Sequence, residues 1–207
     1  MPRRFPRAFV ALVVAAALAA PACSRKGDGG GDRQSAGKAT TTTAAAPPVL
    51  TWTVEGLDPN GTKAPGDDVV AAVTATLNSY LATAVVAPLH TGTPAGDLTP
   101  LLSASALERV QTDPAARAAF VDEGLPKATK ITAETVKATL SSVAGPDEVT
   151  ALVAARLNLA LHVVGPQIDV DIVRTGEVTL SPEADGWRID SFLLHVERNS
   201  RDEAASS

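Results

Sequence analysis

The stretch from Val149 to Val164 alternates strictly between two sets of residues, and this pattern constrains the fold more than any other in the chain. One set is entirely apolar: Val149, Ala151, Val153, Ala155, Leu157, Leu159, Leu161 and Val163. The other set includes Arg156, Asn158 and His162. Because a period of two over this length is incompatible with a helix, the pattern predicts a long twisted strand with one fully apolar side.

Further strands are expected on both sides of this one. The ranges Ile168–Leu180 and Trp187–Val196 read as strands, and Ser181–Gly186 forms the hairpin between them. The second half of Thr129–Val143 predicts another strand. Val49–Val54 is β-branched and aromatic, which predicts a first, peripheral strand.

The segment before these strands has helical periodicity. Asp67 or Asp68 is expected to cap a helix that runs to about Ala87, and Pro88 to end it. Its apolar residues recur at steps of three and four, as one buried stripe requires: Val70, Val73, Leu77, Tyr80, Leu81 and Val85.

Two shorter helices should follow the long one. The first covers Leu98–Val110, and the second begins at the cap Asp113 with Pro114 in its first turn and runs to about Glu123. The sequence therefore predicts an α+β fold, in which a long N-terminal helix and two short helices pack on a curved antiparallel sheet of about four strands.

The N-terminus has the composition of an export signal. Its basic start, Arg3, Arg4 and Arg7, precedes the uncharged run Ala8–Leu18 and a set of small residues that leads to Cys23. The stretch Leu18–Cys23 (LAAPAC) resembles the bacterial lipobox, which implies cleavage before Cys23 and acylation of its thiol. The protein is then expected to be lipid-anchored on the outer face of the cytoplasmic membrane.

Two other interpretations of this N-terminus are weaker. An ordinary secreted protein would leave a lone thiol in an oxidising compartment, which is a liability unless the thiol is acylated. An uncleaved anchor would need about 20 apolar residues to span a bilayer. The run from Ala8 to Ala22 has 15 and is rich in alanine.

We expect four regions in the chain. Residues 1–22 are the signal peptide, 23–48 the lipidated cysteine and a disordered linker, 49–199 the folded domain, and 200–207 a disordered tail. Cys23 is the only cysteine, which excludes a disulfide or a thiolate metal site in the mature fold. From Val49 onward 11 basic residues face 21 acidic ones, a balance that disfavours binding to nucleic acid.

The order of these elements resembles the nuclear transport factor 2-like superfamily, whose members fold as a cone. The resemblance is carried by the helix Asp67–Ala87, the strand pair around Gly165–Pro166, and the closing hairpin Gly186–Phe192 (GWRIDSF). It covers about Val69–Val196 and depends on element order more than on any motif. Cystatin-like folds and lipid-carrying helix-on-sheet lipoproteins are the competing assignments.

Enzymes of that superfamily place an Asp or His with a Tyr inside the cone, and this chain offers five weak candidates: Tyr80, His162, Asp169, Asp171 and His195. None lies in a recognisable catalytic motif, so no role transfers by position. Tyr80 is expected to pack in the core with its hydroxyl bound to a neighbour. His162 and His195 are expected at exposed or half-exposed strand positions.

Asp169 and Asp171 point to the same side of one predicted strand, about 6.5–7 Å apart. Paired carboxylates at this spacing could hold a cation or share a proton. Two oxygen donors are too few for Ca²⁺, so a solvated pair is the favoured interpretation. The sequence therefore predicts no metal and no cofactor.

Three functions remain open at this stage. The favoured one is a non-catalytic binding or interaction module of the cell envelope, with an apolar small molecule or an envelope protein as its partner. The second is a carrier of a lipid or another apolar ligand inside the cone. The third is an enzyme of the dehydratase or isomerase type that uses Tyr80.

Overall fold

The computed structural model describes residues 46–57, 65–144 and 150–201, and these residues form an α+β fold, as the sequence predicts. Its elements, in chain order, are β1 (Thr53–Leu57), α1 (Asp67–Tyr80), the π-helical segment η1 (Leu81–Val86), α2 (Ala87–Thr91), α3 (Ala104–Thr112), α4 (Pro114–Phe120), β2 (Lys130–Ala144), β3 (Thr150–Gly165), β4 (Ile168–Glu183) and β5 (Gly186–Ser200).

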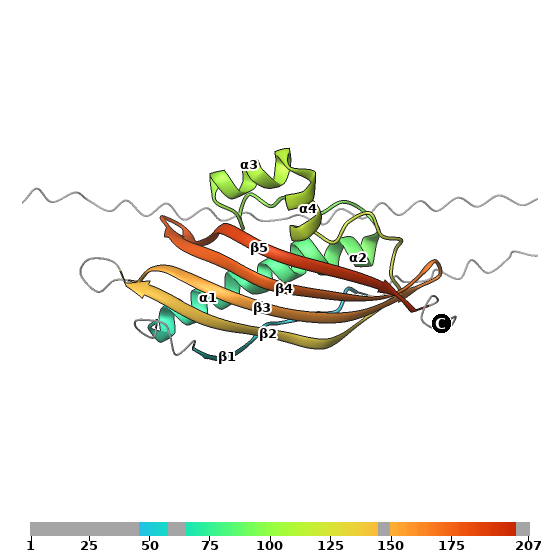
Figure 1. Cartoon of the computed structure of the whole chain (residues 1–207), viewed down its shortest axis with the longest axis horizontal. Coiled ribbons are helices and arrows are strands. Elements are labelled where there is room, and N and C mark those ends of the chain that lie inside the picture. The colour runs from blue at the N-terminus through green and yellow to red at the C-terminus, as the bar shows by residue number, and fades with distance from the viewer. Residues whose placement is uncertain (1–45, 58–64, 145–149, 202–207) are drawn as a thin grey trace, which may run out of the picture. The chain divides into compact units, whose positions relative to one another are not determined.

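The sheet has five strands in the order β1-β2-β3-β4-β5 and is mixed. Strands β2 to β5 are long antiparallel neighbours, whereas β1 pairs with β2 in the parallel direction. The expectation of an antiparallel sheet of about four strands is therefore only loosely met. Strand β1 lies at the edge, as expected for the first strand, and the long strands curve along their length (Figure 1).

Strand β3 follows its sequence pattern from Val153 onward, whereas Ala151, near the start of the strand, is exposed. Its apolar set from Val153 to Val163 is at most 1% exposed, whereas Arg156 and Asn158 on the other side are exposed. Val149 lies outside the described residues. The apolar side faces the helices, and the polar side forms the outer face of the sheet.

The long helix differs from its prediction at both ends. Gly66, rather than an aspartate, is the N-cap residue. Asp67 and Asp68 lie in the first turn, where their negative charges interact favourably with the positive end of the helix dipole. Pro88 does not end the helix: it lies in the first turn of α2, after η1, where a missing N–H is tolerated. The helix ends at Gly92, whose left-handed conformation (φ 69°) forms the C-cap.

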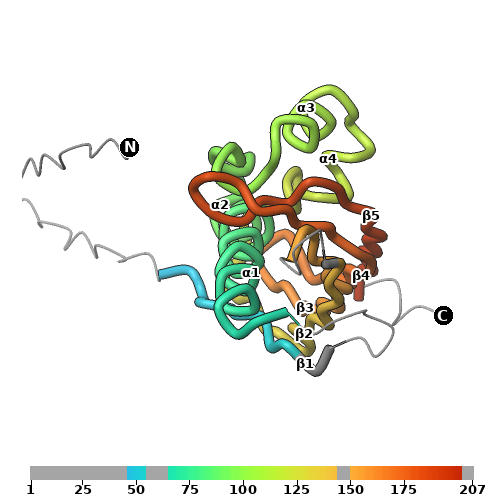
Figure 2. Tube along the Cα trace, turned by 90° about the vertical axis from the view of Figure 1, so that its left-hand side faces the viewer, coloured from blue at the N-terminus to red at the C-terminus, as the bar shows by residue number. Residues whose placement is uncertain are grey.

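The stretch Asp67–Thr91 is the one candidate membrane span among the described residues, by length and composition only. Its residues Val73, Leu77 and Tyr80 are fully buried against the sheet and the shorter helices. Figure 2 shows α1 along one side of the sheet, with α3 and α4 next to β5.

The two short helices are shorter than predicted. Helix α3 begins at Ala104 because Leu101 and Ser103 pair instead with Ile189 of β5, through N–H···O bonds of 2.9 and 3.0 Å. Helix α4 has the predicted cap: the Asp113 carboxylate accepts from the amides of Ala115 and Ala116. It ends at Phe120 rather than Glu123.

Strand β2 is longer than predicted, because all of Lys130–Ala144 is strand. Its pairing with β3 shifts between Ala133 and Thr135. Such a bulge breaks the alternation of inward and outward side chains, which explains why the first half of the strand lacks a clear period in the sequence.

The space between the long helix and the sheet is filled by side chains. Leu77, Leu81, Leu140, Leu159 and Ile172 are all 0% exposed, which leaves no room for a water molecule against them. Phe120 from α4 closes this core, with its ring 4.7 Å from that of Tyr80 and 4.8 Å from that of Phe192. The described interior is therefore a packed core.

Candidate functional site: a buried arginine cluster beside a surface pocket

A charged side chain lies in the middle of the apolar core. Arg174 belongs to the inward-facing row of β4, between Ile172 and Val178, and is 0% exposed. Its Nη1 donates to the Phe120 carbonyl at 2.6 Å and to the Tyr80 hydroxyl. Its Nη2 donates to Asp122 Oδ2 at 2.6 Å. The guanidinium thus joins β4 to α1 and to the segment that follows α4.

Asp122 is placed by the backbone at the end of α4. Its amide donates to the Ala84 carbonyl of the long helix at 2.9 Å, which directs the chain into the core. Its second carboxylate oxygen, Oδ1, accepts from Arg198 Nη2 of β5 at 2.7 Å. One fully buried carboxylate therefore lies between two guanidinium groups.

The Tyr80 hydroxyl is part of this cluster. Burial raises its pKa above the ordinary 10.0, against the lowering effect of Arg174, so the phenol stays protonated at neutral pH. Burial lowers the pKa of Arg174, but the opposing effects of Tyr80 and Asp122 leave it above its ordinary value. With a neutral phenol, the two arginines and one aspartate carry a net charge of one positive unit.

The outer face of the sheet carries a second polar cluster. The Nδ1 atom of His162, on β3, is 2.8 Å from Oδ1 of Asp171. Its Nε2 atom is 3.8 Å from Oδ1 of Asp169. Arg201 Nε donates to Asp171 Oδ2 at 2.9 Å, and this hydrogen bond is the main cause that lowers the pKa of Asp171. The structure thus brings three of the five candidates together, but away from Tyr80.

The remaining candidate, His195, lies on the exposed side of β5, where its Nε2 is 3.1 Å from Glu197 Oε1. Its side chain is 73% exposed. Within the described residues, no three His, Cys, Asp or Glu side chains are arranged to hold a metal ion. Cys23, the expected lipidation site, lies outside the described residues.

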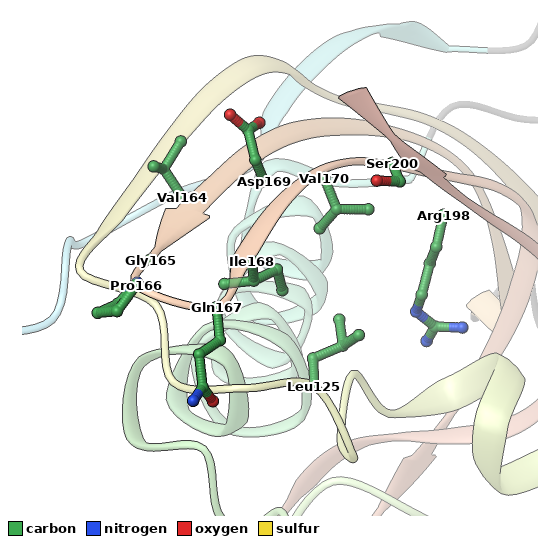
Figure 3. A pocket seen from close by; sticks show the side chains of 10 residues that line it. All are labelled: Leu125, Val164, Gly165, Pro166, Gln167, Ile168, Asp169, Val170, Arg198 and Ser200. Carbon is green, nitrogen blue, oxygen red and sulfur yellow. The ribbon is translucent and has the colours of Figure 1, made fainter. Parts of the chain in front are cut away.

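A surface pocket of about 560 Å³ lies at the end of the sheet, beside the buried cluster (Figure 3). It is formed around the β3–β4 turn, and Arg198 and Ser200 of β5 and the loop residue Leu125 complete it. Figure 3 shows Leu125, Ile168 and Val170 gathered in the middle of the view, with Arg198 beside them. The Asp169 carboxylate points away from this group.

Sequence reasoning did not select Arg174, Asp122 or Arg198. A signal was present for Arg174, because residues at every second position of a strand point to the same face. Arg174 is therefore on the same face as four apolar residues: Val170, Ile172, Val178 and Leu180. An arginine in an apolar row must find a buried partner. No comparable signal marks Asp122, because its position depends on where α4 ends.

Comparisons with protein-family models, with curated proteins and with solved structures found no match to this chain.

Proposed function

We propose that this chain is a bacterial lipoprotein whose α+β domain acts as a non-catalytic binding module at the outer face of the cytoplasmic membrane. The Cys23 lipobox supports the anchor, and the low-complexity segment 24–48 supports a tether. A nuclear transport factor 2-like relationship is part of this proposal and is supported by the order of the elements.

The observation that favours binding over catalysis is the state of Tyr80. An acid–base mechanism needs a hydroxyl that can reach a substrate. The Tyr80 hydroxyl is instead bound to Arg174, with the tyrosine, Arg174 and Asp122 all fully buried. His162, Asp169 and Asp171 lie on the opposite face of the sheet, so an enzyme that combines them with Tyr80 has little support.

The packed interior similarly disfavours a carrier that encloses an acyl chain. An acyl chain would have to displace leucine side chains such as Leu77, Leu159 and Leu161, which are at most 1% exposed. Binding is therefore assigned to the surface, and the pocket around Ile168 and Arg198 is the site we favour.

The anchor is tested with the variant Cys23→Ser in a bacterial host that has the lipoprotein pathway. We expect the wild-type protein in the membrane fraction, with an acylated Cys23 in its mass spectrum, and we expect the variant to lose that acylation. An unmodified, cleaved Cys23 in the wild-type protein would contradict the proposed anchor.

The binding role is tested by photo-crosslinking in the same cells. A photoreactive residue at Gln167, at the rim of the pocket, should give a defined adduct. The same residue at Gln111, which lies in α3 and does not line this pocket, serves as the matched control. The proposed site is wrong if Gln167 gives no adduct, or if both positions give the same adducts.

A further inference from the structure

We infer that the pocket around Arg198 binds a small organic carboxylate that carries an apolar group. This inference deepens the proposed binding function and rests on it. The charge of the buried cluster and the composition of the pocket wall indicate this class of ligand.

The first step is the charge balance of the buried cluster that supplies Arg198 to the pocket wall. Asp122 is shared by Arg174 and Arg198, and the phenol of Tyr80 is neutral, so one positive charge is left without a counter-charge inside the cluster. Uncompensated charge is costly away from water. Arg174 is 0% exposed, and Arg198 is 28% exposed, so Arg198 is the member that an external anion can reach.

The second step is the geometry of Arg198. Its hydrogen bonds with described residues both leave from Nη2, to Asp122 Oδ1 at 2.7 Å and to the Ala118 carbonyl at 3.4 Å. Among the described residues, Nη1 and Nε have no hydrogen-bond partner, so Nη1 can donate to a ligand while Nη2 keeps its bond to Asp122. A hydrogen bond from a guanidinium to a carboxylate is charge-assisted and therefore stronger than one between neutral groups.

The third step is the wall of the pocket. Leu125, Ile168 and Val170 provide apolar surface, and Asp169 is the only other charged residue among the described residues that line the pocket. The Asp169 carboxylate lies on the outer face, 3.8 Å from His162, and points away from Arg198 (Figure 3). A ligand with one carboxylate and one compact apolar group can contact both Arg198 and the apolar residues of this wall.

The test uses the full mature lipoprotein in phosphatidylcholine nanodiscs and two isosteric probes, 4-fluorobenzoate and 4-fluorobenzamide. Binding is followed by the ¹⁹F signal, and empty nanodiscs correct for partitioning into lipid. We expect saturable binding of the benzoate, with the neutral benzamide at least about tenfold weaker because it lacks the charge that Arg198 recognises.

Two variants assign the binding to this pocket. Arg198→Gln removes the guanidinium and should weaken benzoate binding at least about tenfold. Ser200→Trp leaves the cluster intact and fills the pocket from β5, so it should also abolish binding even if Arg198→Gln folds poorly. Asn199→Trp, on the alternate side of the same strand, is the matched control and should bind normally.

Several results would overturn the inference. They are the absence of benzoate binding to the wild-type protein, equal binding of the two probes, and unchanged binding in Ser200→Trp. Inorganic phosphate that displaces the benzoate at equal concentration would show that the apolar wall contributes nothing, and would exclude this ligand class. If the benzoate test fails while Cys23 is acylated and Gln167 gives its adduct, the proposed class of ligand is wrong. The proposed function as a membrane-anchored binding module then still stands.

Discussion

Asp122 accepts hydrogen bonds from two arginines, and its carboxylate is fully buried. At the scale of single residues this group matters most, because removing the partner of a buried charge leaves that charge without compensation. Arg174 depends on it directly: its other hydrogen bonds with described residues go to the neutral oxygens of Tyr80 and Phe120.

The first prediction compares two adjacent acidic residues. Asp122→Asn should lower the free energy of unfolding by about 3–5 kcal/mol, because two guanidinium groups lose the one carboxylate that pairs with them among the described residues. Glu123→Gln, whose carboxylate is partly exposed and pairs with Arg117, should cost at most about 1 kcal/mol. Urea unfolding followed by tryptophan fluorescence measures both, and equal losses would show that the buried cluster does not stabilise the fold.

At the scale of elements, the close approach of β5 to β4 beside Gly176 requires a residue without a side chain. Gly176 has φ 137°, and a Cβ atom there would lie 2.1 Å from the Leu193 carbonyl oxygen of β5. Gly186, at the start of β5, has a similar φ of 144°, but a Cβ atom there would meet nothing within 4 Å. A side chain at Gly186 would therefore cause backbone strain alone, whereas one at Gly176 would cause the same strain and a steric clash with β5.

The second prediction uses this pair. Gly186→Ala should cost about 1–3 kcal/mol, from the unfavourable φ alone. Gly176→Ala should cost clearly more, because β5 must also move away from β4. Thermal unfolding of both variants gives the comparison, and it would contradict the argument if Gly186→Ala were the more destabilised variant.

Elements are also where sequence and structure can be compared most directly. The period-two pattern of β3 predicted its face and its length, because each residue reports its side of the sheet locally. The continuation of the long helix past Pro88 was missed, because it depends on the π-helical register of Leu81–Val86. The late start of α3 was missed because Leu101 and Ser103 pair with Ile189, far away in sequence.

At the scale of the whole molecule, ionisable groups set the pH range of stability. The hydrogen bond from Arg117 is the main cause that lowers the pKa of Glu123 below 4.5, and that from Arg201 does the same for Asp171 below 3.8. The stability that these groups contribute is present above those ordinary values and is lost as the pH falls through the folded pKa. Burial raises the pKa of Tyr80 above 10.0, so its contribution is present below 10.0 and is lost as the pH rises through the folded pKa.

The third prediction follows from these signs. The free energy of unfolding should be nearly constant between about pH 5 and 9 and should fall on both sides. Glu123→Gln should flatten the acid side only, because the alkaline side belongs to Tyr80. Unfolding curves from pH 3 to 11 test this, and an unchanged acid slope in the variant would show that Glu123 is not coupled to folding.

The sequence by itself determined the α+β class, the apolar face of β3, the hairpin between β4 and β5, and the cap of α4, because each depends on neighbours close in the chain. It also marked the lipobox and its cysteine, which remain predictions. Only the tertiary structure decided where the charges lie: Asp122, Arg174 and Arg198 come from three separate segments and meet through long-range packing. The pocket beside them depends on the same convergence, because burying a charge requires partners that local patterns do not reveal.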